Sequence, residues 1–221
     1  MDRLNAGFCP RGGLVFDIGA HVGDRVASFR RLGARVVAVE PQPAALRALR
    51  LMFGRDADVT LVGAAIAARP GMARLHVNTR NPTVSTLSSD FIAAARGAPG
   101  WQAEEWDAVV EVPALTLDAL IARHGTPDFV KIDVEGYEAE ALSGLGTALP
   151  ALSFEFTTIG RDGARAALSQ LSRLGDYRFN VSLGERHLLE WSDWRRADDM
   201  ARWLEEVPDE ANSGDVYARR V

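Results

Sequence analysis

The chain has 221 residues, of which 47% are hydrophobic and 25% charged, and it carries a formal net charge of -5. This length and composition suit one globular domain with a sizeable core. The acidic balance and the lack of a basic stripe argue against a nucleic-acid partner, because phosphate binding relies on clustered Lys and Arg. Cys9 is the only cysteine, so no disulfide can form within the chain, and we expect it to be a structural residue.

Nothing in the sequence marks an export signal or a membrane anchor. Residues 1–10 lack the charged and then apolar pattern of a signal peptide. No apolar run approaches the roughly 20 residues that a membrane helix requires. We therefore expect a cytoplasmic protein with no membrane partner.

The first half of the chain alternates short apolar segments with amphipathic ones. Gly33 and Gly54 stand where two of the amphipathic segments end, as is common at helix C-termini. The pattern predicts strands over 14–18, 36–39, 59–62, 73–77 and 109–115, with helices over 24–32 and 44–53. The strands over 73–77 and 109–115 are expected to lie off the main sheet.

The second half resumes this alternation and then changes character. Thr116 is a predicted helix N-cap. The pattern predicts strands over 128–133 and 152–156, with helices over 117–124, 138–145 and 163–174. Three further strands are predicted over 177–183, 187–191 and 215–219, and they would end the sheet in an antiparallel pair.

The order of these elements predicts an α/β fold over 1–221 as a single domain. Short, continuously apolar strands separated by helices are typical of a parallel sheet that is covered on both faces. We therefore expect a doubly wound, mostly parallel sheet with an antiparallel strand pair at its C-terminal end.

The first predicted strand leads through a glycine turn into a helix, with Asp17, Gly19 and Gly23 in the turn region. Glycine lets the backbone turn tightly and lets a ligand approach it closely, and the helix N-terminus offers free N–H groups. A dinucleotide site would need G-x-G-x-x-G to receive a pyrophosphate, whereas here Gly19 and Gly23 are separated by three residues. The turn therefore favours a cofactor without a pyrophosphate and argues against a nicotinamide-dependent oxidoreductase.

A second predicted strand ends at Glu40, one helix further along the chain. In doubly wound folds an acid at this place accepts hydrogen bonds from the hydroxyls of a ribose. A ribose-binding acid beside a glycine turn, with no phosphate-binding residues, indicates a nucleoside cofactor. S-adenosylmethionine (SAM) is the common cofactor of this kind.

A third group of acids follows the strand over 128–133. Asp133, Glu135 and Glu138 crowd their carboxylates around Gly136, at the edge where open α/β sheets bind ligands. Asp133 is predicted to serve as a general base for a hydroxyl or to orient a methyl-bearing sulfonium. Glu135 is predicted to belong to the site as well, whereas Glu138 is predicted to be structural.

Two further charged residues are less sharply defined by the pattern. Glu155 lies in the next predicted strand and is interpreted either as an acceptor-binding residue or as a helix-entry residue. Asp133 and Glu155 together could hold a divalent cation, but no full ligand set is visible and we predict no metal. Lys131 is expected to reach the surface or to pair with an acid.

Several strings of residues together resemble the FkbM-type family of SAM-dependent methyltransferases. They are Phe-Asp-Ile-Gly-Ala-His-Val-Gly over 16–23, Val-Glu-Pro over 39–41, Thr-Leu-Asp over 116–118 and Lys-Ile-Asp-Val-Glu-Gly-Tyr-Glu over 131–138. The last string is the most family-specific, and the resemblance spans about residues 14–157. It implies a seven-stranded, Rossmann-like class I methyltransferase sheet and methyl transfer to an alcohol oxygen.

The resemblance also implies roles for individual residues. Asp17, Gly19 and Gly23 would line the methionine and ribose side of the cofactor, Glu40 would hold the ribose hydroxyls, and Asp133 would lie beside the transferring methyl group. Ala20 and His21 belong to the same turn and are included among the predicted cofactor-binding residues. For His21, a bond to the cofactor carboxylate and a helix-capping role both stay open.

The segment 78–106 is polar and poorly periodic, and loops of that length in a compact domain are usually functional. We expect a lid or acceptor-binding loop, with Ser85 and Thr86 facing the site, and the alternative is a mobile surface loop. The predicted function is SAM-dependent O-methylation of a small-molecule or carbohydrate acceptor. A non-catalytic module with the same fold stays open as an alternative, and the oligomeric state is left open.

Overall fold

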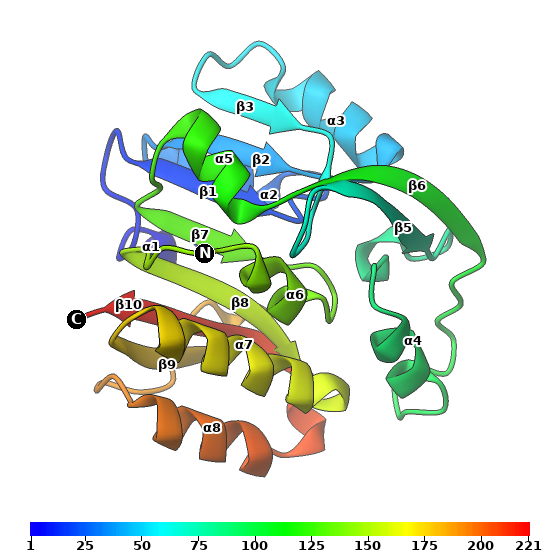
Figure 1. The fold of residues 1–221 in the computed structure, drawn as a ribbon, viewed down its shortest axis with the longest axis vertical. Coiled ribbons are helices and arrows are strands. Elements are labelled where there is room, and N and C mark those ends of the chain that lie inside the picture. Colours follow the sequence, from blue (N-terminus) through cyan, green and yellow to red (C-terminus); the bar gives the residue numbers. More distant parts are fainter.

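The computed structural model describes all of residues 1–221 and contains two sheets. The larger sheet has seven strands in the order β3-β2-β1-β7-β8-β10-β9 (Figure 1). Neighbouring strands from β3 to β8 pair in parallel, whereas β10 runs antiparallel to both β8 and β9, as expected for the C-terminal end. The strands are β1 (Leu14–Ile18), β2 (Arg35–Val39), β3 (Val59–Val62), β7 (Phe129–Ile132), β8 (Ala151–Thr157), β9 (Tyr177–Leu183) and β10 (Ser213–Arg220).

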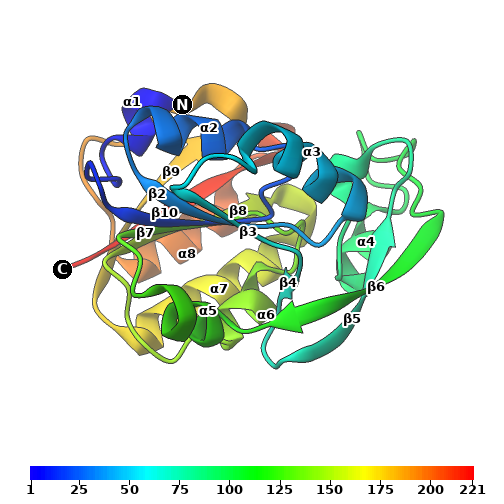
Figure 2. The same ribbon diagram turned by 90° about the horizontal axis from the view of Figure 1, so that it is seen from above.

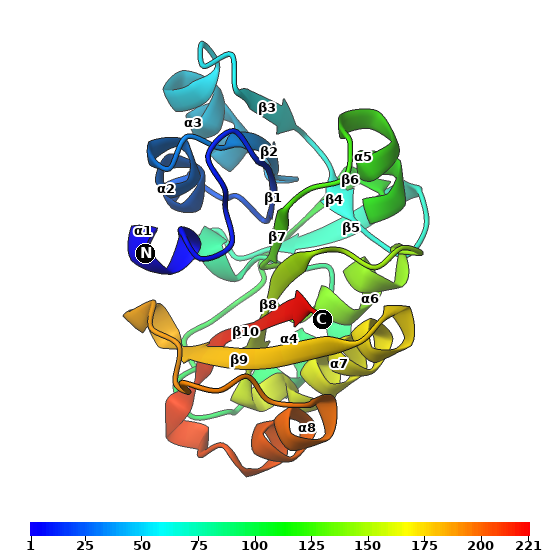
Figure 3. The ribbon, with the colours of Figure 1, turned by 90° about the vertical axis from the view of Figure 1, so that its left-hand side faces the viewer.

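Helices cover both faces of this sheet (Figure 2, Figure 3). One face carries α1 (Asp2–Asn5), α2 (Asp24–Arg31) and α3 (Pro43–Phe53), and the other carries α5 (Leu117–His124), α6 (Glu138–Ser143), α7 (Arg161–Leu174) and α8 (Ala197–Glu206). Because strand side chains alternate in direction, Val15 packs in the core under α1–α3 and Phe16 in the core under α5–α8. None of the helices combines the length and the apolarity needed to cross a bilayer.

A second, smaller sheet and a short helical segment project beyond the carboxyl ends of the parallel strands (Figure 1). The sheet contains β4 (Ala65–Ile66), β5 (Gly71–Val77) and β6 (Ala108–Leu115) in the order β4-β6-β5. The strands predicted over 73–77 and 109–115 therefore lie off the main sheet, as expected. The segment between them holds η1 (Pro82–Val84) and α4 (Ser89–Ala95), which pack around an apolar cluster of their own that includes Phe91 and Trp101.

The strand predicted over 187–191 is wrong. After β9 the chain forms a short turn, η3 (Gly184–Arg186), and then an irregular segment. This segment contacts β9 only at separate points, such as the bridge between Phe179 and Arg195, so no continuous ladder forms. Helix α8 was not predicted, although its buried residues Met200 and Leu204 are spaced for one helix face.

Candidate active site

A cavity of about 390 Å³ opens at the carboxyl edge of the parallel strands, a size typical of small-molecule sites. Its wall comes from the turns after β1, β2 and β7, from the small sheet, and from the segment around η1. The wall includes every site residue predicted from the sequence except Thr86: Asp17, Gly19, Ala20, His21, Gly23, Glu40, Ser85, Asp133, Glu135 and Glu155.

The two glycines of the first turn are required by the packing of the protein itself. Gly19 has a φ of 81°, and a Cβ atom there would lie 1.8 Å from the carbonyl oxygen of Asp133. Gly23 has a φ of 95°, and its Cβ would lie 2.5 Å from the ring of Phe53. The close approach that the sequence suggested for a ligand is thus made at Gly19 by the backbone after β7, which brings the first and third groups of predicted residues together.

Glu40 joins the turn after β1 to the turn after β2. Its side chain is only 2% exposed, and its two oxygens accept hydrogen bonds from the backbone N–H groups of His21 (2.8 Å) and Gln42 (2.7 Å). Burial raises the pKa of Glu40 to about 7 despite these two bonds. Each carboxylate oxygen keeps a second acceptor position, so Glu40 can serve as a clamp and still bind a ligand hydroxyl.

Asp17 is a buried carboxylate without a partner. It is 1% exposed, it lines the cavity, and neither of its oxygens has a hydrogen-bond partner in the protein. Burial raises its pKa to about 6. Buried polar atoms are nearly always satisfied in native proteins, so the position of Asp17 fits a ligand that brings a cation or a hydrogen-bond donor to this wall.

Three carboxyl groups meet on another part of the wall. Asp133, Glu135 and Glu155 each place an oxygen within 4.8 Å of the other two. Burial, reinforced by the mutual repulsion of these groups, raises the pKa of Glu135 and of Glu155 well above the usual range. Oxygens of this kind are the ligands that hard divalent cations prefer, and Glu155 leaves its Oε2 atom buried without a partner.

Glu138 has the structural role predicted for it. Its Oε1 atom accepts hydrogen bonds from the backbone N–H groups of Val134 (3.0 Å) and Gly136 (3.3 Å). The side chain is 5% exposed, and burial raises its pKa to about 7. Glu138 thereby holds the loop that presents Glu135 to the cavity.

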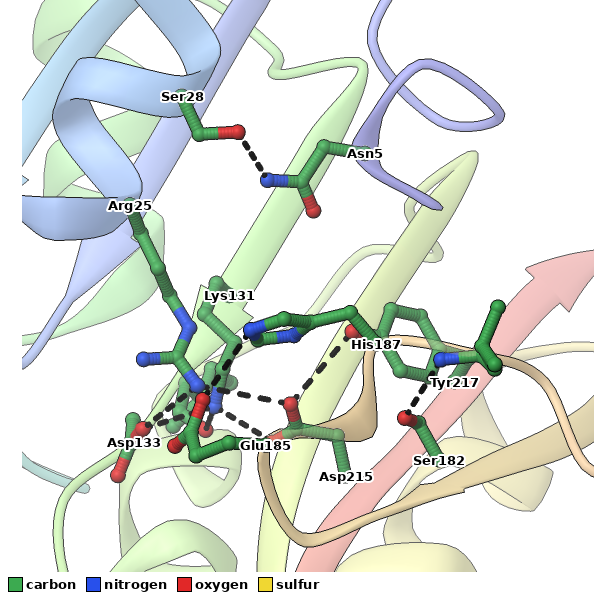
Figure 4. A network of polar contacts seen from close by, with 12 residues as sticks. Asn5, Arg25, Ser28, Lys131, Asp133, Ser182, Glu185, His187, Asp215 and Tyr217 are labelled. Atoms are coloured by element: carbon green, nitrogen blue, oxygen red, sulfur yellow. Dashed lines mark hydrogen bonds and ion pairs between the residues drawn. The ribbon is translucent and has the colours of Figure 1, made fainter. Parts of the chain in front are cut away.

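Asp133 belongs to a network of two cations, Lys131 and Arg25, and two carboxylates, Asp133 itself and Asp215 (Figure 4). Lys131, only 1% exposed, places its Nζ atom 3.1 Å from Asp133 Oδ2 and 2.8 Å from Asp215 Oδ1. Arg25 approaches Oδ2 of Asp133 (3.5 Å) and Oδ2 of Asp215 (3.7 Å). Burial alone would raise the pKa of Asp133, but Lys131 and Arg25 outweigh it and lower the pKa to about 2.

Two members of this network, Arg25 and Asp215, were missed in the sequence analysis. Lys131 pairs with acids, which is one of the two outcomes expected for it. The available signal was the presence of a lysine inside an otherwise apolar strand, because a buried lysine requires a carboxylate partner. Nothing in the sequence indicated which carboxylates would supply it.

The segment around η1 is attached to the turns that form the cavity. Ser85 lines the cavity, and its hydroxyl lies 3.3 Å from Oε1 of Gln42, whose Nε2 group donates to the carbonyl of Pro82 (3.0 Å). Thr86 is fully buried outside the cavity wall, and its hydroxyl donates to the carbonyl of Glu135 at 2.6 Å. The segment is therefore bonded to the turn after Glu40 and to the loop after Asp133.

Other wall residues had no sequence signal. Glu185 reaches the cavity because β9 runs in the same direction as β8, so that the turn after β9 lies at the same edge. An apolar part of the wall is formed by Ala64, Ala65, Ile66 and Leu75. None of the five tryptophans lines the cavity, so no tryptophan there offers a stacking surface to a sugar.

The strand order, the reversed strand β10 and the cavity at the carboxyl edge are the features of the class I methyltransferase fold. The fold is similar to that of a precorrin-6y C5,15-methyltransferase from Geobacter metallireducens, with a TM-score of 0.51 and 15% identity over 99% of this chain and 84% of the other. It is also similar to an O-methyltransferase from Bacillus cereus in complex with SAH, with a TM-score of 0.50 and 12% identity over 100% and 78% of the two chains. At these identities the likeness establishes the fold alone.

The family follows from the sequence itself. Residues 17–210 match the family described as "Methyltransferase FkbM domain", and the chain belongs to that family. The sequence matches none of the curated proteins with which it was compared. The protein is thus a SAM-dependent methyltransferase, and its family and fold imply SAM as the methyl donor.

Proposed function

We propose that this protein transfers a methyl group from SAM to a hydroxyl oxygen of a small molecule or sugar. The observation that carries this proposal is the group of three carboxyls on the cavity wall. Glu135 and Glu155 have raised pKa values, while the adjacent Asp133 is held ionised. A hydroxyl must lose its proton when its oxygen is methylated, and a carboxylate of raised pKa is suited to accept that proton.

The residues of the cavity fit the parts of SAM. The Glu40 carboxylate suits the ribose hydroxyls, and the unpartnered Asp17 suits the positively charged methionine portion. The apolar wall of Ala64–Ile66 and Leu75 suits the adenine ring. When bound, SAM supplies an electrophilic methyl group on a sulfonium.

The catalytic roles divide between Asp133 and Glu135. Asp133 stays ionised and presents a fixed negative charge to the cationic donor, because its pKa of about 2 makes it a weak base. Glu135 would accept the proton that the acceptor hydroxyl loses. Positioning of the two reactants in the enclosed cavity supplies much of the remaining rate.

The charge of the wall supports a neutral or cationic acceptor. Besides the residues already assigned, Asp24 and Glu185 add carboxylates to the wall, whereas its one cationic side chain, Arg25, is already paired. A phosphate-rich acceptor such as a nucleic acid would be repelled by this arrangement. We therefore propose a hydroxyl-bearing small molecule or carbohydrate as the acceptor.

Binding measurements followed by an acceptor screen test the proposal. Titration calorimetry should show that SAM and S-adenosylhomocysteine (SAH) bind and that NADH does not. A panel of neutral, cationic and anionic polyols should then be screened for release of SAH, with mass spectrometry and NMR to locate the added methyl. Methylation at nitrogen or carbon would contradict the proposal, and binding of SAM without turnover on any acceptor would favour a non-catalytic module.

The glutamate assigned as the base is tested by Glu135→Gln. We expect its turnover to fall by about 10²-fold to 10⁴-fold, with SAH affinity within about 2-fold of the wild type. Glu206→Gln, at an exposed site on α8, is the matched control and should retain full turnover. Wild-type turnover in Glu135→Gln would remove Glu135 from the mechanism.

A further inference from the structure

The network behind Asp133 belongs to a row of polar residues that crosses one face of the main sheet. Strand pairing places Asp17 beside Lys131, Lys131 beside Ser153, and Ser153 opposite Tyr217. Paired residues on neighbouring strands point to the same face of a sheet. The row is buried, with Ser153 fully buried and Tyr217 only 3% exposed, so the ammonium group of Lys131 requires carboxylate partners there.

The reversed direction of β10 brings Asp215 into this row. The parallel strands end at the cavity edge, whereas β10 starts there, so a residue near its beginning lies beside Glu155, near the end of β8. Asp215 is 5% exposed and makes the shortest contact of Lys131, at 2.8 Å. The buried ammonium group of Lys131 thus lies between Asp133, which lines the cavity, and Asp215, which does not.

The two oxygens of Asp133 have different surroundings. Lys131 and Arg25 both approach Oδ2, and Lys131 also donates to the carbonyl of Ile132 at 3.3 Å, which restricts where its Nζ atom can move. A side-chain contact with Glu155 also favours the ionised form of this carboxylate. Since Asp133 lines the cavity, the cations hold its Oδ2 atom while the carboxylate faces a ligand there.

We propose that Lys131, held in place by Asp215, is a positioning residue that anchors Oδ2 of Asp133 and keeps this carboxylate ionised toward the reacting groups. This proposal rests on the proposed role of the cavity as the SAM and acceptor site. Lys131 itself touches neither, because it lies behind Asp133 and does not line the cavity.

The charges around Asp133 show why a cation is needed at this place. Glu135, Glu155 and Asp17 face it as carboxyl groups, and burial raises the pKa of each of them. Without Lys131, Arg25 would be the one cation left beside Asp133. The ionisable groups that interact with Asp133 or form ion pairs with its two cations are Asp17, Arg25, Glu40, Lys131, Glu135, Glu138, Glu155 and Asp215.

The test follows Asp133 directly by NMR of protein labelled with ¹³C at the aspartate carboxyls, with its signal assigned through Asp133→Asn. In the wild type the chemical shift of this carbon should stay at the value of an ionised carboxylate down to pH 4. In Lys131→Met, a substitution that preserves length and removes the charge, the signal should titrate above pH 4. Arg31→Met removes one cation from a surface ion pair and is the charge-matched control, in which Asp133 should behave as in the wild type.

The second measurement compares SAM with SAH, which lacks the transferring methyl group and its positive charge. At a pH where Asp133 of Lys131→Met is protonated, we expect the ratio of SAM affinity to SAH affinity to fall by about 5-fold to 10-fold relative to the wild type. The ratio cancels effects common to both ligands, including general loosening of the fold, and Arg31→Met should leave it unchanged.

The outcomes separate the two proposals. Titration of Asp133 above pH 4 in the wild type, or an unchanged signal and affinity ratio in Lys131→Met, would overturn the positioning role. Should Lys131→Met fail to fold, the wild-type titration alone decides. Failure of the wild type to bind either SAM or SAH, with Asp133 ionised as expected, would instead overturn the proposed function of the cavity.

Discussion

Four carboxyl groups in and around the site have different ionisation properties because their neighbours differ. Glu40 and Glu138 accept two backbone N–H bonds each, yet burial raises their pKa values to about 7. Asp17 has no partner at all and its pKa rises to about 6. Asp133 touches two cations and its pKa falls to about 2. Backbone amides alone therefore do not offset desolvation here, whereas a lysine and an arginine do.

Glu40→Gln tests the contact proposed for the ribose. The substitution removes the negative charge and replaces one acceptor oxygen by an amide group, so ribose hydroxyls and one backbone N–H group lose their acceptor. We expect SAH to bind about 10-fold to 100-fold more weakly, which corresponds to about 1.4 to 2.7 kcal/mol. Titration calorimetry measures this, with Glu206→Gln as the control and circular dichroism to verify folding. Unchanged SAH affinity would remove Glu40 from the cofactor site.

Glu138→Gln tests the link between burial and stability. Between pH 4.5, the ordinary pKa of a glutamate, and about 7, the folded protein keeps a proton on Glu138 that the unfolded chain has lost. The stabilisation from this proton is complete below that window and is lost as the pH rises through it. Glutamine keeps the acceptor oxygen for Val134 and Gly136 and cannot ionise.

The free energy of unfolding of the wild type should therefore fall more steeply between pH 5 and 8 than that of Glu138→Gln, by about 1–3 kcal/mol over the range. Urea denaturation at a series of pH values provides the measurement. Glu206→Gln should follow the wild-type curve. Identical slopes for Glu138→Gln and the wild type would show that Glu138 is not protonated in the folded protein.

At the scale of elements, the site depends on contacts between turns that lie far apart in the sequence. The turn after β1 touches the backbone after β7 at Gly19, and Glu40 bonds the turn after β1 at His21. Thr86 ties the segment around η1 to the loop that carries Glu135. Each turn or segment that carries predicted site residues is thus held in place by a hydrogen bond or a packing contact to another one.

Gly19→Ala should disrupt the contact between the turn after β1 and β7. The new Cβ atom would overlap the Asp133 carbonyl oxygen, and the φ of 81° is unfavourable for alanine. We expect the free energy of unfolding to drop by about 2–4 kcal/mol, measured by urea denaturation. Gly163→Ala in α7 is the control, since nothing lies within 4 Å of its added Cβ, and it should be neutral or slightly stabilising. Equal stability of the two variants would contradict the packing role of Gly19.

Thr86→Val should loosen the segment around η1 without changing its shape. The hydroxyl of Thr86 donates to Glu135 and accepts from the Ser88 N–H group at 2.9 Å, so valine leaves both groups without this partner. We expect a loss of about 1–3 kcal/mol in unfolding free energy and faster hydrogen exchange near Ser88. Thr60→Val, at an exposed site of β3, should change neither quantity. Unaltered exchange near Ser88 would show that the segment is held by its apolar cluster alone.

At the scale of the whole molecule, one cavity is lined by residues from both sheets and from the turn after β9. A ligand that occupies it contacts distant parts of the chain together and should stabilise the native state as a unit. The small sheet lines the cavity through Ala65, Ile66 and Leu75, and η1 lines it through Thr83. These elements and α4 lie beyond the carboxyl ends of the parallel strands (Figure 1). We propose that this part, which contains the expected lid over 78–106, selects the acceptor.

SAH should raise the thermal unfolding midpoint of the protein in proportion to the logarithm of its concentration. At 100 times its dissociation constant it should add about 2.7 kcal/mol to the free energy of unfolding. NADH at the same concentration should have no effect, since the turn at Gly19 and Gly23 lacks the spacing for a pyrophosphate. Differential scanning calorimetry makes this comparison, and stabilisation by NADH alone would contradict the assignment of the cofactor.

Local patterns in the sequence determined the class of fold, the order of most elements and the position of the turns that line the cavity. They did so because strand and helix periodicity, glycine turns and acids at strand ends are properties of short segments. The irregular segment over 187–191 was beyond this reasoning, since an apolar run such as Leu188-Leu189 suits a strand or a packed loop equally well. Helix α8 carries a helical spacing at Met200 and Leu204 that was not recognised.

Only the tertiary structure decided the ionisation states and the partners of the acids that the sequence predicted as site residues. Asp215 and Glu185 reach the cavity edge because of the directions of β10 and β9, and Arg25 reaches it from α2. The sequence predicted Asp133 as a base or an orienter, and the two cations beside it favour the second role. A pKa depends on burial and on charges within a few ångströms, and those neighbours are set by chain reversal and sheet order rather than by any local pattern.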